Sequence, residues 1–173
     1  TPKGCSSGKN CLFDPQVNVS ISNRQPGSAF KPFVYALAFS IGLTPKTHIW
    51  DVQTEFNYNC PASGLAEKDN YGQDCYHPQN YDGLFKGQIT LRDALAQSRN
   101  LPAVKVLYLV GLKNAIDFTK QFGITTLKEE KNYGLSLVLG GGEVKLLEMT
   151  LAYSVFANEG IIPQLNFIKE IID

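Results

Sequence analysis

The sequence has no apolar run that approaches the roughly 18 residues a helix needs to cross a bilayer. It also carries no net charge, because 16 basic residues balance 16 acidic ones, so its charge indicates neither nucleic acid nor an anionic membrane surface as a partner. The first ten residues, TPKGCSSGKN, contain no apolar signal core. We therefore expect any segment that exports the protein to lie outside this sequence.

Residues that bind metals are scarce. The two histidines, His48 and His77, show no metal-ligand spacing, and no C-x-x-C occurs. The cysteines form two close pairs in polar loops: Cys5 with Cys11, and Cys60 with Cys75. An even number of loop cysteines suits disulfides in an oxidising compartment. Of the three possible connectivities the sequence favours the local pairing, with four free thiols as the alternative, and we expect no metal or organic cofactor.

What is present is the composition of a globular protein, with 43% hydrophobic and 18% charged residues. The apolar spacing predicts the following elements: a strand at 16–22, helices at 28–40, 90–97, 102–110, 114–122 and 144–158, and a strand at 163–172. Helix 102–110 is apolar nearly all round and should be buried on every side. Residues 44–88 lack periodicity, and so long a stretch is more often functional than accidental.

Ser28 and Lys31 form an S-x-x-K at the start of a predicted helix. Three residues are nearly one helical turn, so the hydroxyl and the amine are expected within hydrogen-bond reach. A lysine can act as the base for a serine nucleophile if burial lowers its pKa. Because S-x-x-K also occurs at residues 6–9 in a Gly/Ser loop, the context decides: a Pro-Gly turn precedes only Ser28, and an apolar helix follows it.

Ser98-Arg99-Asn100 is the one S-x-N of the sequence and lies at the break between two predicted apolar helices. The first of these helices begins with a capping box at Thr90–Asp93. As plain structure, Ser98 and Asn100 would be a helix C-cap and N-cap. As a site, Ser98 would relay protons and Asn100 would hold a substrate amide. Arg99 is expected to be a solvated side chain, with a carboxylate partner as the alternative.

Three blocks make the sequence resemble a known family. They are RQPGSAFKPFVY (24–35), NYDG (80–83) followed by ITLRDALAQSRNLPAVK (89–105), and LGGG (139–142) followed by LEMTLAY (147–153) and FANEG (156–160). In this order they resemble the transpeptidase domain of class A (bifunctional) penicillin-binding proteins, whose motif set is S-x-x-K, S-x-N and K-T-G. The third motif is absent, since the one Lys-Thr pair, Lys46-Thr47, is followed by His48.

The resemblance implies an α+β fold, of which this chain would be the mostly helical portion, with the main antiparallel sheet largely missing. We expect residues 1–14 to be a loop or linker. Residues 15–173 would be a partial transpeptidase domain that lacks the C-terminal strands with the K-T-G motif and is inactive alone. A membrane anchor and a glycosyltransferase domain are expected upstream.

The resemblance also implies a mechanism. Ser28 would form an acyl-enzyme with peptidoglycan stem peptides or with β-lactam antibiotics, Lys31 would be its base, Ser98 would relay a proton and Asn100 would bind substrate. The reaction would take place on the outer face of the bacterial cytoplasmic membrane, and no nucleic acid is expected as a partner. The alternatives are a serine β-lactamase, a D,D-carboxypeptidase, or a non-catalytic penicillin-sensing domain.

Overall fold

The computed structural model describes residues 17–166, 168 and 170–172. Its elements, in order, are β1 (Asn23–Arg24), η1 (Gly27–Phe30), α1 (Lys31–Ser40), β2 (His48–Asp51), β3 (Gly87–Thr90), α2 (Leu91–Ala96), α3 (Asn100–Val110), α4 (Leu112–Lys120), η2 (Glu130–Asn132), η3 (Leu135–Leu139), β4 (Val144–Lys145) and α5 (Leu146–Ala157). The five α-helices match the predicted number, and the helical part of an α+β fold is confirmed.

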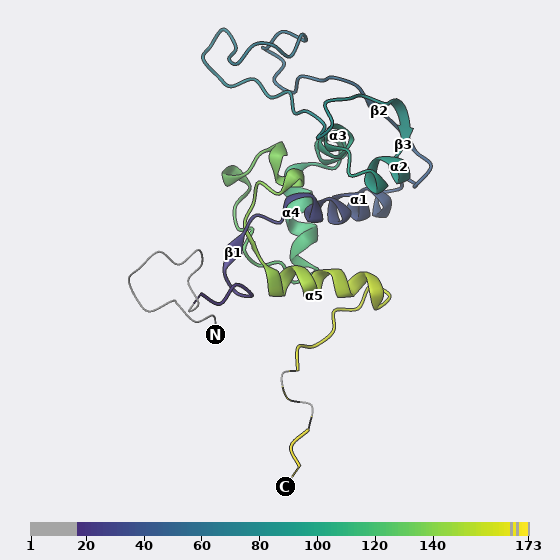
Figure 1. The fold of residues 1–173 in the computed structure, drawn as a ribbon, viewed down its shortest axis with the longest axis vertical. Coiled ribbons are helices and arrows are strands. Elements are labelled where there is room, and N and C mark those ends of the chain that lie inside the picture. Colours follow the sequence, from purple (N-terminus) through teal and green to yellow (C-terminus); the bar gives the residue numbers. More distant parts are fainter. Residues whose placement is uncertain (1–16, 167, 169, 173) are drawn as a thin grey trace, which may run out of the picture.

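The core lies between α1 and α3, which pack against each other and against α4 and η3 (Figure 1). In α1 the fully buried side chains include Phe33, Val34 and Ala38, and Pro32 lies in the first turn, where its missing N–H has no partner to lose. The prediction that α3 is buried on every side is wrong at one edge. Tyr108 and Leu109 are each 64% exposed.

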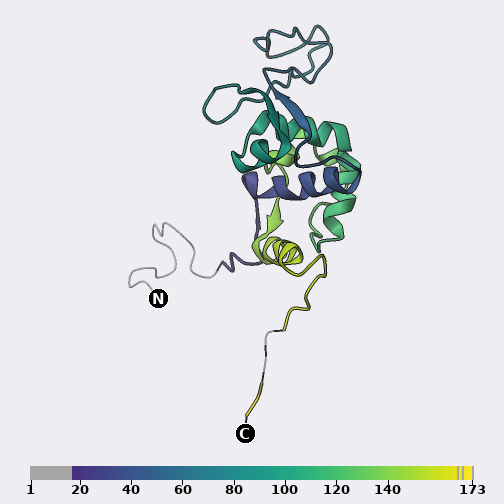
Figure 2. The same cartoon turned by 90° about the vertical axis from the view of Figure 1, so that its right-hand side faces the viewer.

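Two short antiparallel sheets flank the helices. β1 pairs with β4, with Arg24 opposite Val144, and β2 pairs with β3, with Asp51 opposite Gly87. The second pair closes the long irregular segment into a loop that extends away from the helices in both views (Figures 1 and 2). A disulfide between Cys60 and Cys75 ties this loop across 15 residues.

The disulfide confirms one half of the predicted local pairing, and the other half, at Cys5 and Cys11, lies outside the described residues. The capping box is also confirmed, because Thr90 Oγ1 accepts a hydrogen bond from the backbone N–H of Asp93. This bond begins α2 directly after β3, so the chain passes from the sheet into the helices without a linker.

The predicted strand at 16–22 is wrong over its described part. Residues 19–21 form a turn and Ser22 a bend, because the Asn18 side chain accepts from Ser20 N–H and the Asn18 backbone carbonyl accepts from Ile21 and Ser22 N–H. Asn side chains offer the backbone such local partners in place of a strand ladder. The strand at 163–172 is also wrong where it can be seen. Residues 163–166, 168 and 170–172 adopt no regular element, since none of them has a described strand to pair with.

Candidate active site

Ser28 lies exposed in η1, a single 3₁₀ turn directly before α1. The turn is held from two sides. The Tyr153 hydroxyl of α5 donates to the Ala29 carbonyl at 2.8 Å, and Gly140 packs so closely that a Cβ there would be 2.2 Å from Gly27 N. Gly140 also has a φ of +92°, so only glycine fits its conformation and this contact together. The glycine run of the third sequence block thus supports the backbone of the Ser28 turn.

Lys31, the first residue of α1, is 0% exposed. Its amine donates three hydrogen bonds across the fold, to the Ser98 carbonyl at 2.6 Å, to Ser98 Oγ at 3.2 Å and to Asn100 Oδ1 at 2.8 Å. All three acceptors are uncharged. Burial therefore acts without compensation by a carboxylate and lowers the pKa of Lys31 to about 8.

Ser98 forms the bend between α2 and α3 that the sequence predicts. It has a φ of +53°, which is uncommon for a residue other than glycine, and its side chain is exposed. The bend is closed by hydrogen bonds from Ser98 N–H to the Leu95 carbonyl and from Arg99 N–H to the Ala94 carbonyl, both at 2.9 Å. Strained backbone at such a bend aims the Ser98 carbonyl and hydroxyl at Lys31.

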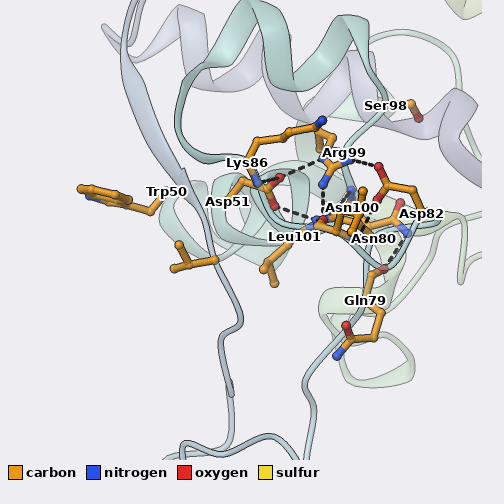
Figure 3. A network of polar contacts seen from close by, with 12 residues as sticks. Trp50, Asp51, Gln79, Asn80, Asp82, Lys86, Ser98, Arg99, Asn100 and Leu101 are labelled. Atoms are coloured by element: carbon orange, nitrogen blue, oxygen red, sulfur yellow. Dashed lines mark hydrogen bonds and ion pairs between the residues drawn. The ribbon is translucent and has the colours of Figure 1, made fainter.

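Arg99 is buried, 5% exposed, and the prediction of a solvated side chain is wrong (Figure 3). Its Nε donates to Asp51 Oδ2 at 2.8 Å, Nη1 to Asp82 Oδ2 at 2.6 Å, and Nη2 to the Leu84 carbonyl. Burial alone lowers the pKa of Arg99, but the bonds to Asp82 and Asp51 raise it above its ordinary value. Burying the Asp51 carboxylate and the Arg99 guanidinium would be costly for either group alone, and their pairing offsets this cost.

Asn80 joins this ion cluster to the start of α3. Its amide nitrogen donates to Asp51 Oδ1 at 2.7 Å and to the Leu84 carbonyl at 2.9 Å. Its amide oxygen accepts from the N–H groups of Asn100 at 2.9 Å and Leu101 at 3.2 Å. Figure 3 shows Asp51, Asn80, Asn100 and Leu101 close together, with these bonds as dashed lines.

The structure brings three of the four predicted site residues into direct contact: Lys31, Ser98 and Asn100. Ser28 lies one turn before Lys31 on the same segment, but among the described residues its hydroxyl makes no hydrogen bond to that amine, which bonds to residues 98 and 100 instead. Chemically, the arrangement offers an exposed hydroxyl one turn before a buried amine whose pKa is lowered to about 8.

Sequence reasoning missed Asp51, Asn80 and Asp82 as part of this arrangement. NYDG was recognised only as a block of resemblance, and Asp51 stands in a segment read as irregular. Only a buried arginine requires carboxylate partners, and the sequence around Arg99 does not indicate that this side chain is buried.

A hollow of about 400 Å³ lies beside the Ser28 turn, between β1, β4 and α5. Its lining includes Pro26, Ala29, Met149 and Tyr153 and is mostly apolar. Ser28, Lys31, Ser98 and Asn100 do not line it, so this hollow is separate from the contacts among Lys31, Ser98 and Asn100. The geometry of the side chains themselves, rather than this apolar hollow, defines the candidate site.

One group of possible metal ligands occurs among the described residues, formed by Glu55, Cys60 and Cys75. The two sulfurs are joined in the disulfide, and the Glu55 carboxylate accepts from Asn57 N–H and from Tyr76 N–H and contacts the His77 ring. A cysteine binds a metal as a free thiolate, so the two sulfurs of this group are not available as ligands.

Solved structures share this fold. Penicillin-binding protein 1A from Haemophilus influenzae is similar with a TM-score of 0.68 at 29% identity, over 83% of this chain and 20% of that one. The penicillin-binding protein PonA1 from Mycobacterium tuberculosis is similar with a TM-score of 0.68 at 20% identity, over 85% and 37%. The class of protein that this fold defines is therefore the penicillin-binding transpeptidase.

Sequence comparison leads to the same class. The chain matches the family model "Penicillin binding protein transpeptidase domain" over residues 8–173 and belongs to that family. Relatives include penicillin-binding protein 1A of Neisseria flavescens, 37% identical over 150 residues, and that of Rickettsia conorii, 38% identical over 150 residues. Each match covers 87% of this chain and 17% of the relative, so the chain spans about a sixth of its curated relatives' length. The predicted family resemblance is confirmed.

In the part of the chain that the structure describes, no helix is both long and apolar enough to cross a membrane.

Proposed function

We propose that this chain carries the acyl-forming serine of a peptidoglycan D,D-transpeptidase, with Ser28 as nucleophile and Lys31 as its base. The observation that supports this most is the environment of Lys31, a fully buried amine with uncharged partners and a pKa lowered to about 8, placed three residues after an exposed serine. A base with a pKa near the working pH is what serine activation requires.

The reaction follows from these groups. The neutral Lys31 amine takes the proton of Ser28 Oγ as that oxygen attacks the carbonyl of the penultimate D-alanine of a stem peptide. The C–N bond to the terminal D-alanine then breaks, its nitrogen receives a proton through Ser98, and an acyl-enzyme remains. The amine of a second stem peptide attacks this ester and loses a proton, which restores the Ser28 hydroxyl and makes the cross-link.

A β-lactam has a strained amide that the same serine would open, with slow release. The backbone N–H of Ser28 would supply one donor to the oxyanion, and Asn100 would hold the substrate's amide groups. The relatives named above are called penicillin-binding proteins. We expect the complete protein to act on peptidoglycan outside the cytoplasm, with an anchor and a glycosyltransferase domain preceding residues 15–173.

The test is covalent labelling with penicillin, mapped by mass spectrometry. The complete gene product is used, because no Lys-[Ser/Thr]-Gly occurs in this chain. We expect one adduct, on Ser28, that Ser28→Ala removes and that Ser6→Ala, in the other S-x-x-K, leaves intact. Label elsewhere or no label contradicts the proposal. A rapidly hydrolysed adduct would indicate a β-lactamase instead.

A further inference from the structure

The start of α3 is capped from outside the helix. A helix leaves its first N–H groups without partners, and a side chain at the N-cap usually accepts from one of them. Here the N-cap residue, Arg99, makes no such bond. The amide oxygen of Asn80, twenty residues earlier in the chain, accepts from Asn100 and Leu101 N–H in its place.

The orientation of the Asn80 amide is dictated by Asp51. An ionised carboxylate only accepts hydrogen bonds, so the NH₂ group of Asn80 must face Asp51 Oδ1, 2.7 Å away, and the oxygen must face α3. Both residues are buried, Asp51 at 0% and Asn80 at 4% exposure. The other oxygen of Asp51, Oδ2, accepts from Arg99 Nε and from Lys86 N–H. Both oxygens therefore act as acceptors, and the direction of the Asn80 amide is fixed.

The same loop orients the side chain of Asn100. The Asn100 Nδ2 group donates to the carbonyl of Gln79 at 2.9 Å, which leaves Oδ1 to accept from Lys31 at 2.8 Å. Each bond of this network therefore donates toward Asp51. The Lys31 amine donates to Asn100, Asn100 donates to the segment 79–80, and Asn80 donates to Asp51. If this segment were displaced, Asn100 could turn its NH₂ group toward Lys31 and repel it.

We propose that Asn80 is a positioning residue of the transpeptidase site: held by Asp51, it fixes the start of α3 so that Asn100 and Ser98 present oxygens to Lys31. This inference rests on the proposed function of Ser28 and Lys31. Asn80 touches no reacting atom and acts through Asn100. A shift of about 1 Å in such a supporting group is enough to lower a rate roughly 100-fold.

The test exploits a swap that the geometry permits. Asn80→Asp places two carboxylates against each other, whereas Asn80→Asp combined with Asp51→Asn restores one donor and one acceptor with the bond reversed. In the double variant, Asp at 80 still accepts from the α3 N–H groups, and Asn at 51 still accepts from Arg99. The Leu84 carbonyl loses the bond from Asn80 and faces a carboxylate oxygen, but it keeps the bond from Arg99 Nη2. The double variant should therefore recover part of the loss. The rate constant of Ser28 acylation by labelled penicillin is measured at saturation, separately from the binding constant, in the complete gene product.

We expect Asn80→Asp to lower the acylation rate constant roughly 100-fold, and we expect the double variant to be within about tenfold of the wild type, because its bond between positions 51 and 80 is restored. The matched control is Asn57→Asp in the same loop, where Asn57 Nδ2 donates to Asp69 Oδ2 at 3.2 Å. It makes the same chemical change away from Lys31 and should leave the rate constant unchanged even if the thermal midpoint falls.

Three outcomes overturn the inference. These are an unchanged rate constant in Asn80→Asp, an equal loss in Asn57→Asp, or a folded double variant that remains roughly 100-fold slower than the wild type. The last keeps the test decisive if Asn80→Asp alone fails to fold. If instead the wild-type protein is not labelled on Ser28, the proposed function fails, and the two failures are thus distinguishable.

Discussion

The pH dependence of Ser28 acylation gives the sharpest test of the proposed base. With its pKa lowered from 10.5 to about 8 by burial, Lys31 is about 9% neutral at pH 7, whereas an ordinary lysine would be about 0.03% neutral, a difference of roughly 300-fold. Because the neutral amine is the form that accepts the serine proton, the acylation rate constant should follow this fraction. It should rise about 90-fold from pH 6 to pH 9 and level off above that.

The assay is the initial rate of labelled-penicillin incorporation at saturation, in the complete gene product, over pH 6–9.5. Lys31→Arg is the control, because a guanidinium keeps its proton throughout this range and cannot serve as the base. It should lose acylation at every pH. A wild-type rate that stays flat from pH 6 to pH 9, or one that still rises tenfold per unit at pH 9.5, refutes the reasoning. The first result means that Lys31 is not the base, and the second that its pKa is not lowered.

Three further changes test the packing, each by urea unfolding of the complete gene product. Tyr35→Phe should change the free energy of unfolding by less than about 1 kcal/mol or raise it, because the buried Tyr35 hydroxyl has no hydrogen-bond partner among the described residues; a larger loss contradicts this. Cys60→Ser with Cys75→Ser should cost about 3 kcal/mol, as a 15-residue loop predicts, and no loss contradicts it. Gly140→Ala should cost about 3 kcal/mol or more, from positive φ plus a backbone clash. Gly42→Ala, with a φ of +108° and open space, should cost distinctly less, and equal costs contradict the clash.

Local signals in the sequence were sufficient for the helices. The Pro-Gly turn, Pro32 and the apolar spacing after it placed α1 within a few residues, and the Thr90–Asp93 box placed the start of α2. These signals depend on backbone groups a few residues apart. The same reasoning failed at residues 17–22, where alternation indicated a strand but the Asn18 side chain formed turns, because a strand also needs a partner that alternation does not supply.

The ion cluster could not be predicted in the same way. Arg99 and Asp51 are 48 residues apart, and β2, on which Asp51 lies, is only four residues long within a segment without periodicity. Nothing in either neighbourhood indicates burial, which comes only from the packing of α3 on β2 and α1. A long-range pair of this kind is a property of the tertiary fold.

Lys31 is where the packing of the core and the proposed chemistry meet. Its neighbours Phe30, Phe33 and Val34 are fully buried, so the helix that buries them buries the amine as well. A charged amine in that position is costly unless it is paired, and the fold supplies uncharged oxygens from residues 98 and 100 in place of a carboxylate. A carboxylate there would stabilise the ammonium and hold its pKa high. Uncharged acceptors stabilise the ammonium less than a carboxylate would. The pKa of Lys31 is therefore low enough for the amine to lose its proton near the pH at which a serine must be activated.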